Sequence, residues 1–480
     1  MSNSHFPALP SDPKALSGAS RTKQTSSSNI VLDIGNAGED LSINRHSVGQ
    51  GGLSEEPTFD PHIQALKNLN VESIRIFLSE YFDVYPSRGV YNWEILDRTI
   101  KTILDCGAKP ILAICFKPKT LYPEINENIV HPNSYKEWEQ LIFEMVKRYN
   151  IEKKCGIEYW EVWNEPDIGE QGGCPGKFTP EDYCIFYEHT AKAVKKADPK
   201  AKVGGPALCS HEDKILPALL KHCREKNVPL DFVTWHIYND DPLAYKNSMI
   251  FVRKLLEENK MKCEMGITEW NSGLFGLVTD HEDNREFQPC FVLECVKEMI
   301  EEGLDFSCFY HIRNINIKRE TLGRFLSEQK SIFFEDFVNN HFGHLGMFDY
   351  QGIARPVYFS FKMLSTLLGK RINVAAKEGN VKVLAAYDEK LNIMSAVIWN
   401  FAVSKPKAEK VSIKMNMPLG SGDYDYIRYV LDVNTPSQEE TAKIKAVKHT
   451  VLKDSQGSFK DSFALSPYGV TRIYFRKRMF

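Results

Sequence analysis

Long apolar runs are absent from this sequence of 480 residues. No stretch approaches the roughly 18 consecutive apolar residues that a membrane-spanning helix needs. An excess of one charge is absent too, because 60 Lys and Arg face 63 Asp and Glu, for a formal net charge of −3. This balance removes the electrostatic argument for nucleic acid or an anionic membrane as the main partner. With 42% hydrophobic and 26% charged residues, the composition is that of a globular protein.

Paired cysteine motifs are also missing. The eleven cysteines run from Cys106 to Cys308 without a CxxC pair, so neither a zinc site nor a disulfide framework is indicated. Cys115 and Cys308 lie within apolar stretches, where a small buried thiol is expected. No HExxH, phosphate-binding loop or dinucleotide fingerprint occurs either, and we therefore expect no metal and no organic cofactor.

Residues 1–28 are rich in Ser and Pro and lack the apolar segment of a standard secretory signal. We expect a disordered tail here. The missing signal and the unpaired cysteines together favour a reducing compartment, so the expected location is cytoplasmic.

From residue 43 to residue 370, short apolar runs alternate with segments of helical period. This alternation predicts a parallel sheet covered by helices, and eight such units fit a (β/α)₈ TIM barrel. A doubly wound open sheet is the alternative, but no GxGxxG follows a strand. The expected barrel strands are Ile43–Val48, Ser73–Phe77, Pro110–Cys115, Ile157–Val162, Lys202–Gly205, Phe232–Tyr238, Met265–Glu269 and Phe306–His311.

Residues 371–480 show a different sequence pattern. Short runs of alternating apolar and polar residues are separated by Gly, Pro, Asn and Ser. This pattern predicts a C-terminal β-sandwich. A strand within residues 29–42, ahead of the barrel, is a candidate for joining it. The expected sandwich strands are Val381–Tyr387, Asn392–Asn400, Lys410–Met415, Asp425–Val433 and Thr471–Arg476.

Two of the predicted barrel strands end in glutamate. The first runs into Asn164, Glu165 and Pro166, and the second ends at Glu269, followed by Trp270. Catalytic residues of such barrels collect at the carboxyl ends of the strands, so we expect Glu165 and Glu269 to face each other across the barrel mouth. Regular strand alternation would point Asn164 and Glu165 to opposite faces. The chain must therefore leave strand geometry at Asn164.

Opposed carboxylates beside tryptophans suit glycoside hydrolysis. One carboxylic acid protonates the leaving oxygen, while one carboxylate attacks or stabilises the anomeric carbon. A low-dielectric wall next to Glu165 would raise its pKa and keep it protonated. Of the neighbouring tryptophans, Trp270 is the strongest candidate for a contact with the sugar.

The sequences WNEP (Trp163–Pro166) and ITEW (Ile267–Trp270) resemble those of the clan A retaining glycosidases. The closer resemblance is to glycoside hydrolase family 39, which includes β-xylosidases and α-L-iduronidases. It extends in order from Ser42 to Lys370, and that family also has a C-terminal β-sandwich. Supporting segments are Ile74–Arg75, Tyr91–Trp93 with Asp97, Gly107–Pro110, Val203–Pro206 and His236–Tyr238.

The resemblance implies a role for each site residue. Glu165 would be the general acid/base and Glu269 the nucleophile. The supporting residues would be Asn164 at the sugar 2-hydroxyl, Tyr238 orienting Glu269, and His236 and Arg75 beside the two carboxylates.

The sequence departs from the family at two places. Tyr310-His311 stands where the clan commonly has tryptophan, and residues 312–342 form a long insertion. The loop Gly169–Lys177 is rich in glycine and carries no role of its own, and both this loop and the insertion are expected to border the sugar pocket.

The expected function is a retaining glycosidase, β-xylosidase-like, with carboxyl groups about 5–5.5 Å apart. Its partner would be an oligosaccharide or glycoside, with no nucleic acid and no membrane. The alternatives are another clan A enzyme, either an α-L-arabinofuranosidase or a polysaccharide endo-hydrolase, and a non-catalytic carbohydrate-binding barrel. Exo or endo action, the sugar and the oligomeric state stay open.

Overall fold

The computed structural model describes residues 27–51, 59–273, 286–374, 379–416, 422–432, 443–453 and 458–478. The expected tail lies outside these residues, except that residues 27 and 28 belong to a strand, β1 (Ser27–Asp33). Among the helices described, none is long and apolar enough to cross a membrane.

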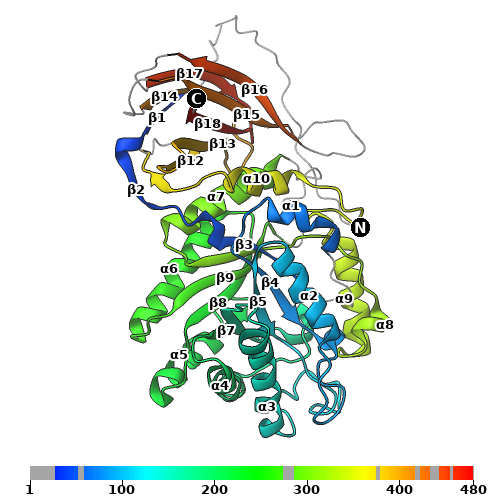
Figure 1. The fold of residues 1–480 in the computed structure, drawn as a ribbon. Coiled ribbons are helices and arrows are strands. Elements are labelled where there is room, and N and C mark those ends of the chain that lie inside the picture. The colour runs from blue at the N-terminus through cyan, green and yellow to red at the C-terminus, as the bar shows by residue number, and fades with distance from the viewer. Residues whose placement is uncertain are drawn as a thin grey trace, which may run out of the picture.

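Eight parallel strands close into a barrel in the order β10-β3-β4-β5-β6-β7-β8-β9 (Figure 1). The predicted TIM barrel is therefore confirmed. One expected strand was placed too early, because Ile43–Arg45 forms a 3₁₀ turn and the strand begins at His46. The strands are β3 (His46–Gln50), β4 (Ser73–Leu78), β5 (Lys109–Ile114), β6 (Tyr159–Val162), β7 (Lys202–Leu208), β8 (Phe232–Tyr238), β9 (Glu264–Asn271) and β10 (Phe306–Tyr310).

Helices pack around the outside of the barrel. The hydroxyl of Thr179 caps one of them by accepting the N–H of Asp182 at 3.1 Å, and Pro180 takes its first position. The helices are α1 (Ile63–Lys67), α2 (Glu94–Asp105), α3 (Tyr135–Val146), α4 (Pro180–Ala197), α5 (Ile215–Lys226), α6 (Pro242–Glu258), α7 (Phe287–Glu301) and α10 (Pro356–Leu364).

The lower part of the barrel interior is filled by apolar side chains: Ile111, Tyr159, Phe232, Phe306 and Cys308. Gly204 and Gly266 make room for two of these rings, since a Cβ at either position would collide with Phe232 or Phe306. Polar side chains are stacked above this floor, on the side of the carboxyl ends of the strands.

The C-terminal strands form a sandwich. A three-stranded sheet has the order β1-β14-β17, and a seven-stranded sheet has the order β16-β15-β18-β13-β12-β11-β2. β1, from the start of the chain, pairs in parallel with β14. The strands are β2 (Ala37–Asp40), β11 (Lys370–Ile372), β12 (Val381–Asp388), β13 (Ile393–Asn400), β14 (Glu409–Asn416), β15 (Tyr424–Asp432), β16 (Lys443–Leu452), β17 (Ser458–Leu465) and β18 (Val470–Lys477).

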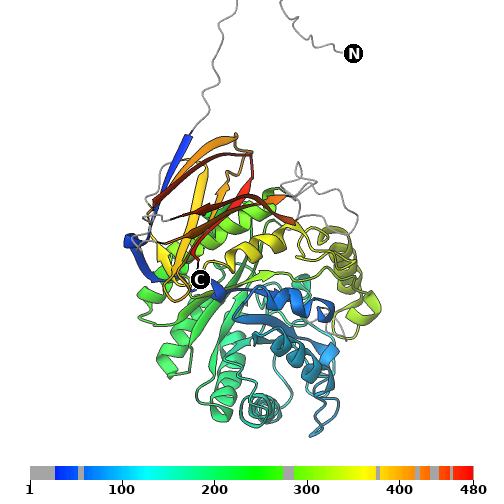
Figure 2. The same ribbon diagram turned by 45° about the horizontal axis from the view of Figure 1, so that its top comes forward.

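The sequence prediction missed the short β2 and β11 as well as β16 and β17. β16 lies at the edge of its sheet and none of its residues is buried. It carries lysines in place of a core pattern, as edge strands commonly do. The sandwich packs against α7 and α10 (Figures 1 and 2). Across this contact Trp399 Nε1 donates to Glu294 Oε2 at 2.9 Å.

The insertion at 312–342 contains two further helices, α8 (Arg319–Leu322) and α9 (Glu328–His341), which pack on each other. α9 also contacts the 3₁₀ turn η6 (Gly169–Gly172) in the loop that follows β6.

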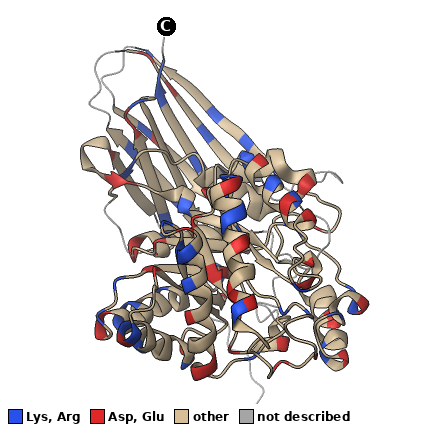
Figure 3. Cartoon of the chain, turned by 60° about the horizontal axis from the view of Figure 1, so that its bottom comes forward, with Lys and Arg blue, Asp and Glu red and all other residues tan. Residues whose placement is uncertain are grey.

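Basic and acidic residues are interleaved along the outer helices in Figure 3. Between α6 and α7, for example, Lys246 and Arg253 approach Glu302 to 3.0 and 3.2 Å. The near-zero net charge is thus matched by local pairing.

Candidate active site

Glu165 follows the end of β6 on an irregular stretch of backbone. Trp163 and Glu165 both have positive φ, 76° and 48°, which is the left-handed region that residues other than glycine rarely adopt. The N–H of Glu165 donates to Ala207 O on the neighbouring β7 at 2.9 Å. Because the chain leaves strand geometry on both sides of Asn164, the side chains of Asn164 and Glu165 both reach the barrel mouth.

Glu269 points inward from β9 because of a bulge in that strand. In the pairing of β8 with β9, Trp235 lies opposite Ile267 but His236 lies opposite Glu269, so Thr268 is an extra residue in the strand. Such a bulge re-aims the side chains around it. Thr268 and Glu269 consequently both contact groups inside the barrel.

Arg75, on β4, connects the buried polar groups. It donates to Glu161 Oε2 at 2.7 Å, to Glu269 Oε1 at 2.8 Å and to Asn164 Oδ1 at 2.6 Å. The residue is only 2% exposed. Burial disfavours its charge, but Glu161 and Glu269 outweigh burial and raise the pKa of the guanidinium. Arg75 therefore stays a cation that fixes two carboxylates and one amide.

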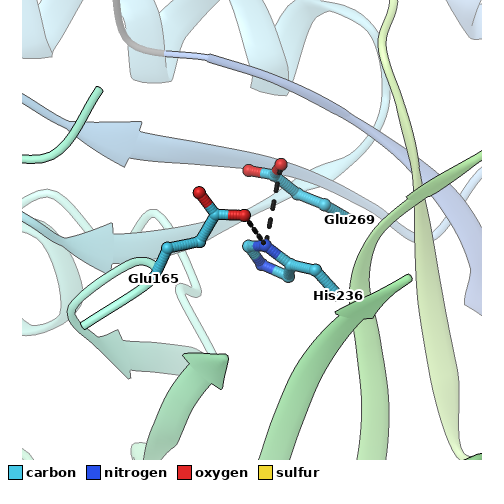
Figure 4. A group of neighbouring side chains, drawn as sticks. All are labelled: Glu165, His236 and Glu269. Carbon is cyan, nitrogen blue, oxygen red and sulfur yellow. Dashed lines mark hydrogen bonds and ion pairs between the residues drawn. The ribbon is translucent and has the colours of Figure 1, made fainter. Parts of the chain in front are cut away.

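Tyr238 and His236, both on β8, complete the contacts of the two carboxylates. Tyr238 Oη donates to Glu269 Oε2 at 2.9 Å. His236 Nδ1 lies 3.0 Å from Glu165 Oε1 and 3.7 Å from Glu269 Oε2 (Figure 4). One atom each of Glu165, His236 and Glu269 lies within 4.8 Å of the other two. The two glutamates therefore lie side by side at the barrel mouth.

The electrostatic surroundings of the two glutamates differ. Burial and then the charge of Glu269 hold the pKa of Glu165 well above its usual value. Burial also raises the pKa of Glu269, but Arg75 and the Tyr238 hydroxyl oppose it. Burial and Arg75 lower the pKa of His236, which keeps the imidazole neutral. The proton of this pair is therefore expected on Glu165 and the negative charge on Glu269.

The sequence model of glycosyl hydrolases family 39 matches residues 45–441. The chain belongs to this family. The resemblance found in the motifs is thereby confirmed.

Two curated relatives in this sequence comparison are β-xylosidases. That of Caldicellulosiruptor saccharolyticus is 28% identical over 347 residues, covering 66% of this chain and 66% of the relative. That of Geobacillus stearothermophilus is 24% identical over 361 residues, covering 68% of this chain and 66% of the relative. The chain thus spans just under two thirds of the length of these relatives.

Solved structures of similar fold include a family 39 enzyme from Xanthomonas axonopodis pv. citri, with a TM-score of 0.76, 18% identity and coverage of 96% and 100%. A monomeric β-xylosidase from Caulobacter crescentus has a TM-score of 0.76, 18% identity and coverage of 94% and 100%. An α-L-arabinofuranosidase from Thermotoga maritima has a TM-score of 0.63, 16% identity and coverage of 93% and 99%. At these identities the likeness shows the fold alone.

Of the residues predicted for this family 39 site, the structure brings together Arg75, Asn164, Glu165, His236, Tyr238 and Glu269. It does not bring Trp270 to them. That ring is 0% exposed and packs against Tyr245 of α6, Phe309 of β10 and Phe361 of α10. The predicted sugar contact is wrong because Trp270 follows the inward-facing Glu269 and so points outward.

The family departure at Tyr310-His311 also becomes clear. Tyr310, at the end of β10, lies edge-on to Tyr238 with ring centroids 6.4 Å apart. Its pKa is raised well above the usual value, first by burial and then by the charges of Glu269 and Glu165. His311 instead faces Asn314, with Nε2 3.0 Å from Oδ1. Tyr310 is therefore the residue of the pair that borders the site.

The loop Gly169–Lys177 borders the site, as expected, but through contacts that the sequence does not specify. Asn164 Nδ2 donates to Cys174 Sγ at 3.3 Å. Gly172 packs so closely on Glu165 that a Cβ there would collide with Oε2. The glycine-rich composition was the available signal, but it did not say which residue the loop approaches. This loop forms one wall of the glutamate site.

The insertion holds that loop in place. Ser327, just before α9, donates its N–H and its hydroxyl to Glu170 at 3.0 and 2.5 Å. Phe334 of α9 lies directly against Gly173, where a Cβ would collide with the ring. Residues 312–342 are thus connected to Glu165 and Asn164 through the loop.

Two carboxylates and an imidazole can also bind a metal ion, so the cluster has to be tested for that chemistry. Both oxygens of Glu269 are engaged, one by the guanidinium of Arg75 and one by the hydroxyl of Tyr238. A fixed positive charge 2.8 Å from one of the donor atoms opposes a second cation. The donor set fits glycosidic chemistry better than metal binding.

Proposed function

We propose that this protein is a retaining glycoside hydrolase that acts on β-xylosides. The observation that carries the proposal is a pair of neighbouring carboxyl groups with unequal surroundings. Glu165 and Glu269 have oxygens within 4.8 Å, and of the two only Glu269 is hydrogen-bonded by Arg75 and Tyr238. Retaining enzymes hold their carboxyl groups about 5–5.5 Å apart, and inverting enzymes about 6.5–9.5 Å. The short spacing leaves no room for a water molecule behind the sugar.

In the first step, the Glu269 carboxylate attacks the anomeric carbon and forms an ester bond to it. The bond from that carbon to the leaving oxygen breaks, and the proton of Glu165 passes to that oxygen. The raised pKa of Glu165, caused mainly by burial, provides the proton at neutral pH. The positive charge of Arg75 holds Glu269 in its ionised, attacking form.

In the second step, Glu165 is a carboxylate and takes a proton from water. The water oxygen attacks the anomeric carbon, and the ester bond to Glu269 breaks, which restores both side chains. Two inversions at one carbon give net retention. The neutral His236, 3.0 Å from Glu165, stabilises whichever form of Glu165 is present without adding a charge.

Asn164 is fixed by two hydrogen bonds, accepted from Arg75 and donated to Cys174. A side-chain amide has two N–H donors, so one of them is left for the 2-hydroxyl of the sugar. This contact would strengthen in the transition state, as is common in glycosidases.

The choice of β-xyloside is supported by the two β-xylosidases among the relatives. An α-L-arabinofuranosidase of similar fold makes the arabinofuranoside the second candidate. Hydrolysis of 4-nitrophenyl β-D-xyloside against 4-nitrophenyl α-L-arabinofuranoside separates the two. Product lengths from a xylan polymer separate exo from endo action.

A mechanism-based label tests the reaction type itself. A 2-fluoro-β-xyloside with a good leaving group should add one fluoroxylosyl unit to the intact mass, and peptide mapping should place it on Glu269. Glu269→Ala is the control that should take no label. A wild-type protein that takes no label and releases no nitrophenol from either glycoside would be a carbohydrate-binding barrel instead.

A further inference from the structure

A third buried glutamate shares Arg75 with Glu269. Glu161 is on β6, and its side chain is 0% exposed. Its Oε2 accepts the Nε–H of Arg75 at 2.7 Å, and its Oε1 accepts the hydroxyl of Thr268 at 2.8 Å. Each oxygen thus has a donor from a different strand. Neither step of the proposed reaction uses this carboxylate.

Thr268 is the extra residue of the β9 bulge that turns Glu269 inward. Regular alternation would point Thr268 and Glu269 to opposite faces of the strand, so the bulge has to be held open for both to point inward. Thr268 is 0% exposed, and its hydroxyl bonds to Glu161. β6 and β9 are not neighbours in the barrel, so this hydrogen bond crosses the interior. It therefore holds the bulge in the form that aims Glu269 at the mouth.

The positive charge of Arg75 is divided between two carboxylates. Its ion pair with Glu161 measures 2.7 Å and that with Glu269 measures 2.8 Å, and none of the three side chains is more than 7% exposed. Burial raises the pKa of Glu269, Arg75 and Tyr238 oppose this, and the charge of Glu161 raises the pKa again. Glu161 thus offsets part of the stabilisation that Arg75 gives to the ionised nucleophile.

Other titratable groups also face Glu269, from the neighbouring strands β8 and β10 and from across the barrel. They are Arg75, Glu165, His236, Tyr238, Cys308 and Tyr310. Glu161 differs from them because it reaches Glu269 by two routes at once. One route is the guanidinium of Arg75, and the other is the backbone of Thr268, directly before Glu269 in the chain.

We propose that Glu161 and Thr268 are positioning residues for the nucleophile Glu269. Thr268 fixes the direction of the Glu269 side chain. Glu161 anchors Thr268 and limits how strongly Arg75 stabilises the Glu269 carboxylate, since a carboxylate of lower pKa attacks the anomeric carbon less readily. The proposal rests on the proposed glycosidase function and deepens it, because the nucleophile is prepared both by its own strand and by the strand of the acid/base.

The two roles can be separated by substitutions that nearly keep the shape of the side chain. Thr268→Val removes the hydroxyl without changing a charge, and Thr268→Ser keeps a hydroxyl. Glu161→Gln removes the charge but keeps both contacts. The amide oxygen can accept from Arg75, and the amide N–H can donate to the hydroxyl of Thr268.

Two matched controls carry the same substitutions outside the barrel interior. Thr190→Val changes a 0% exposed threonine of α4 whose hydroxyl accepts the indole N–H of Trp138 at 2.9 Å. Glu294→Gln changes a buried glutamate of α7 that bonds to Trp399 of the sandwich. Thermal melts of every variant establish that the proteins compared are folded.

Two measurements report on Glu269. The rate at which a 2-fluoro-β-xyloside with a good leaving group labels the protein measures the attack alone, and kcat/KM on 4-nitrophenyl β-D-xyloside against pH gives the acidic limb. Thr268→Val should label about tenfold more slowly than the wild type with its acidic limb unmoved, and Thr268→Ser should recover to within about threefold. Glu161→Gln should move the acidic limb to lower pH by about one unit and label about threefold more slowly. Both controls should match the wild type.

A wild-type labelling rate in Thr268→Val, or the same loss in Thr190→Val, would refute the aiming role. An acidic limb that stays in place in Glu161→Gln, or that moves equally in Thr268→Val, would refute the electrostatic role of Glu161. Glu161→Gln keeps both contacts and decides the proposal by its pH profile if Thr268→Val does not fold. In each of these cases an active wild type leaves the glycosidase standing. A wild type that takes no label and hydrolyses no aryl xyloside refutes the proposed function, and this proposal with it.

Discussion

The ends of β6 and β9 carry the same residue type at the same rim, yet they hold it in opposite ways. Glu269 accepts hydrogen bonds from the guanidinium of Arg75 and the hydroxyl of Tyr238 inside the barrel. Glu165 has a left-handed backbone conformation, and its side chain contacts Gly172 and the neutral imidazole of His236. One environment keeps a carboxylate charged, and the other keeps a carboxylic acid protonated. The two roles thus arise from the surroundings and not from the residue type.

The largest test of this comparison removes each glutamate in turn. Glu269→Ala and Glu165→Ala should each lower kcat on an aryl xyloside by about 10³-fold or more. Added azide should then distinguish the two sites by its product: an α-xylosyl azide with Glu269→Ala and a β-xylosyl azide with Glu165→Ala. Glu264→Gln, at the other end of β9 and paired with Lys202, is the control. Full activity in both alanine variants would contradict the assignment.

The next test removes Arg75, the cation that binds Glu269 at the end of β9. Arg75→Met leaves Glu161, Glu269 and Asn164 without their shared donor, and a buried charge without its partner costs about 3–5 kcal/mol of unfolding free energy. Urea unfolding measures this loss. Arg253→Met, which removes a half-exposed partner of Glu302, should cost no more than about 1 kcal/mol. An equally small cost for Arg75→Met would show that Arg75 does not carry the network.

A third test uses pH and stability. Burial raises the folded-state pKa of Glu165, so the folded protein binds a proton more tightly than the unfolded chain does. Stability from this group is therefore present below the unfolded pKa, about 4.3, and is lost as the pH rises through the folded pKa. Glu165→Gln should remove that part of the loss and gain stability relative to the wild type between pH 5 and pH 8 in thermal melts. A constant difference across this range would show that Glu165 is not perturbed.

A smaller change shifts one limb of the pH–rate profile. Tyr238→Phe removes a donor that stabilises the ionised form of Glu269, so the pKa of Glu269 should rise. The acidic limb of kcat/KM should then move to higher pH by about one unit, with the alkaline limb, set by Glu165, almost unchanged. Tyr245→Phe is the matched control, since that hydroxyl donates only to backbone carbonyls. A shift of both limbs would place Tyr238 in contact with both glutamates.

The smallest effect is expected from the contact between Ser327 and Glu170, which holds the loop that packs against Glu165. Ser327→Ala removes the hydroxyl that donates to Glu170 and should lower kcat by about two- to threefold, with unfolding free energy lowered by about 1 kcal/mol. Ser412→Ala, whose hydroxyl pairs with Ser462 in the sandwich, should leave kcat unchanged. A kcat equal to that of the wild type for Ser327→Ala would show that the insertion does not influence Glu165.

The sequence was sufficient for the parts of the molecule that depend on local patterns. Buried parallel strands are apolar runs, so β4, β5 and β8 could be found, and the break before Pro166 identified the irregular stretch at Asn164. Trp270 is misplaced when it is assigned by its position beside a catalytic motif, because strand alternation points it away from the inward-facing Glu269. The support from Ser327 to Glu170 joins segments 157 positions apart in the chain, and the bond from Asn164 to Cys174 is made within an irregular loop. Such contacts leave no local pattern.

The pairing of β1 with β14 has a consequence for how the chain is made. β1 precedes the barrel strands in the chain and its partner β14 follows them, nearly 400 positions later, so the sandwich cannot be completed until the whole barrel has been synthesised. A protein cut after the barrel would leave β1 as an open edge, ready to pair with other chains. A shortened version intended as an isolated barrel should therefore begin after β1 to stay monomeric.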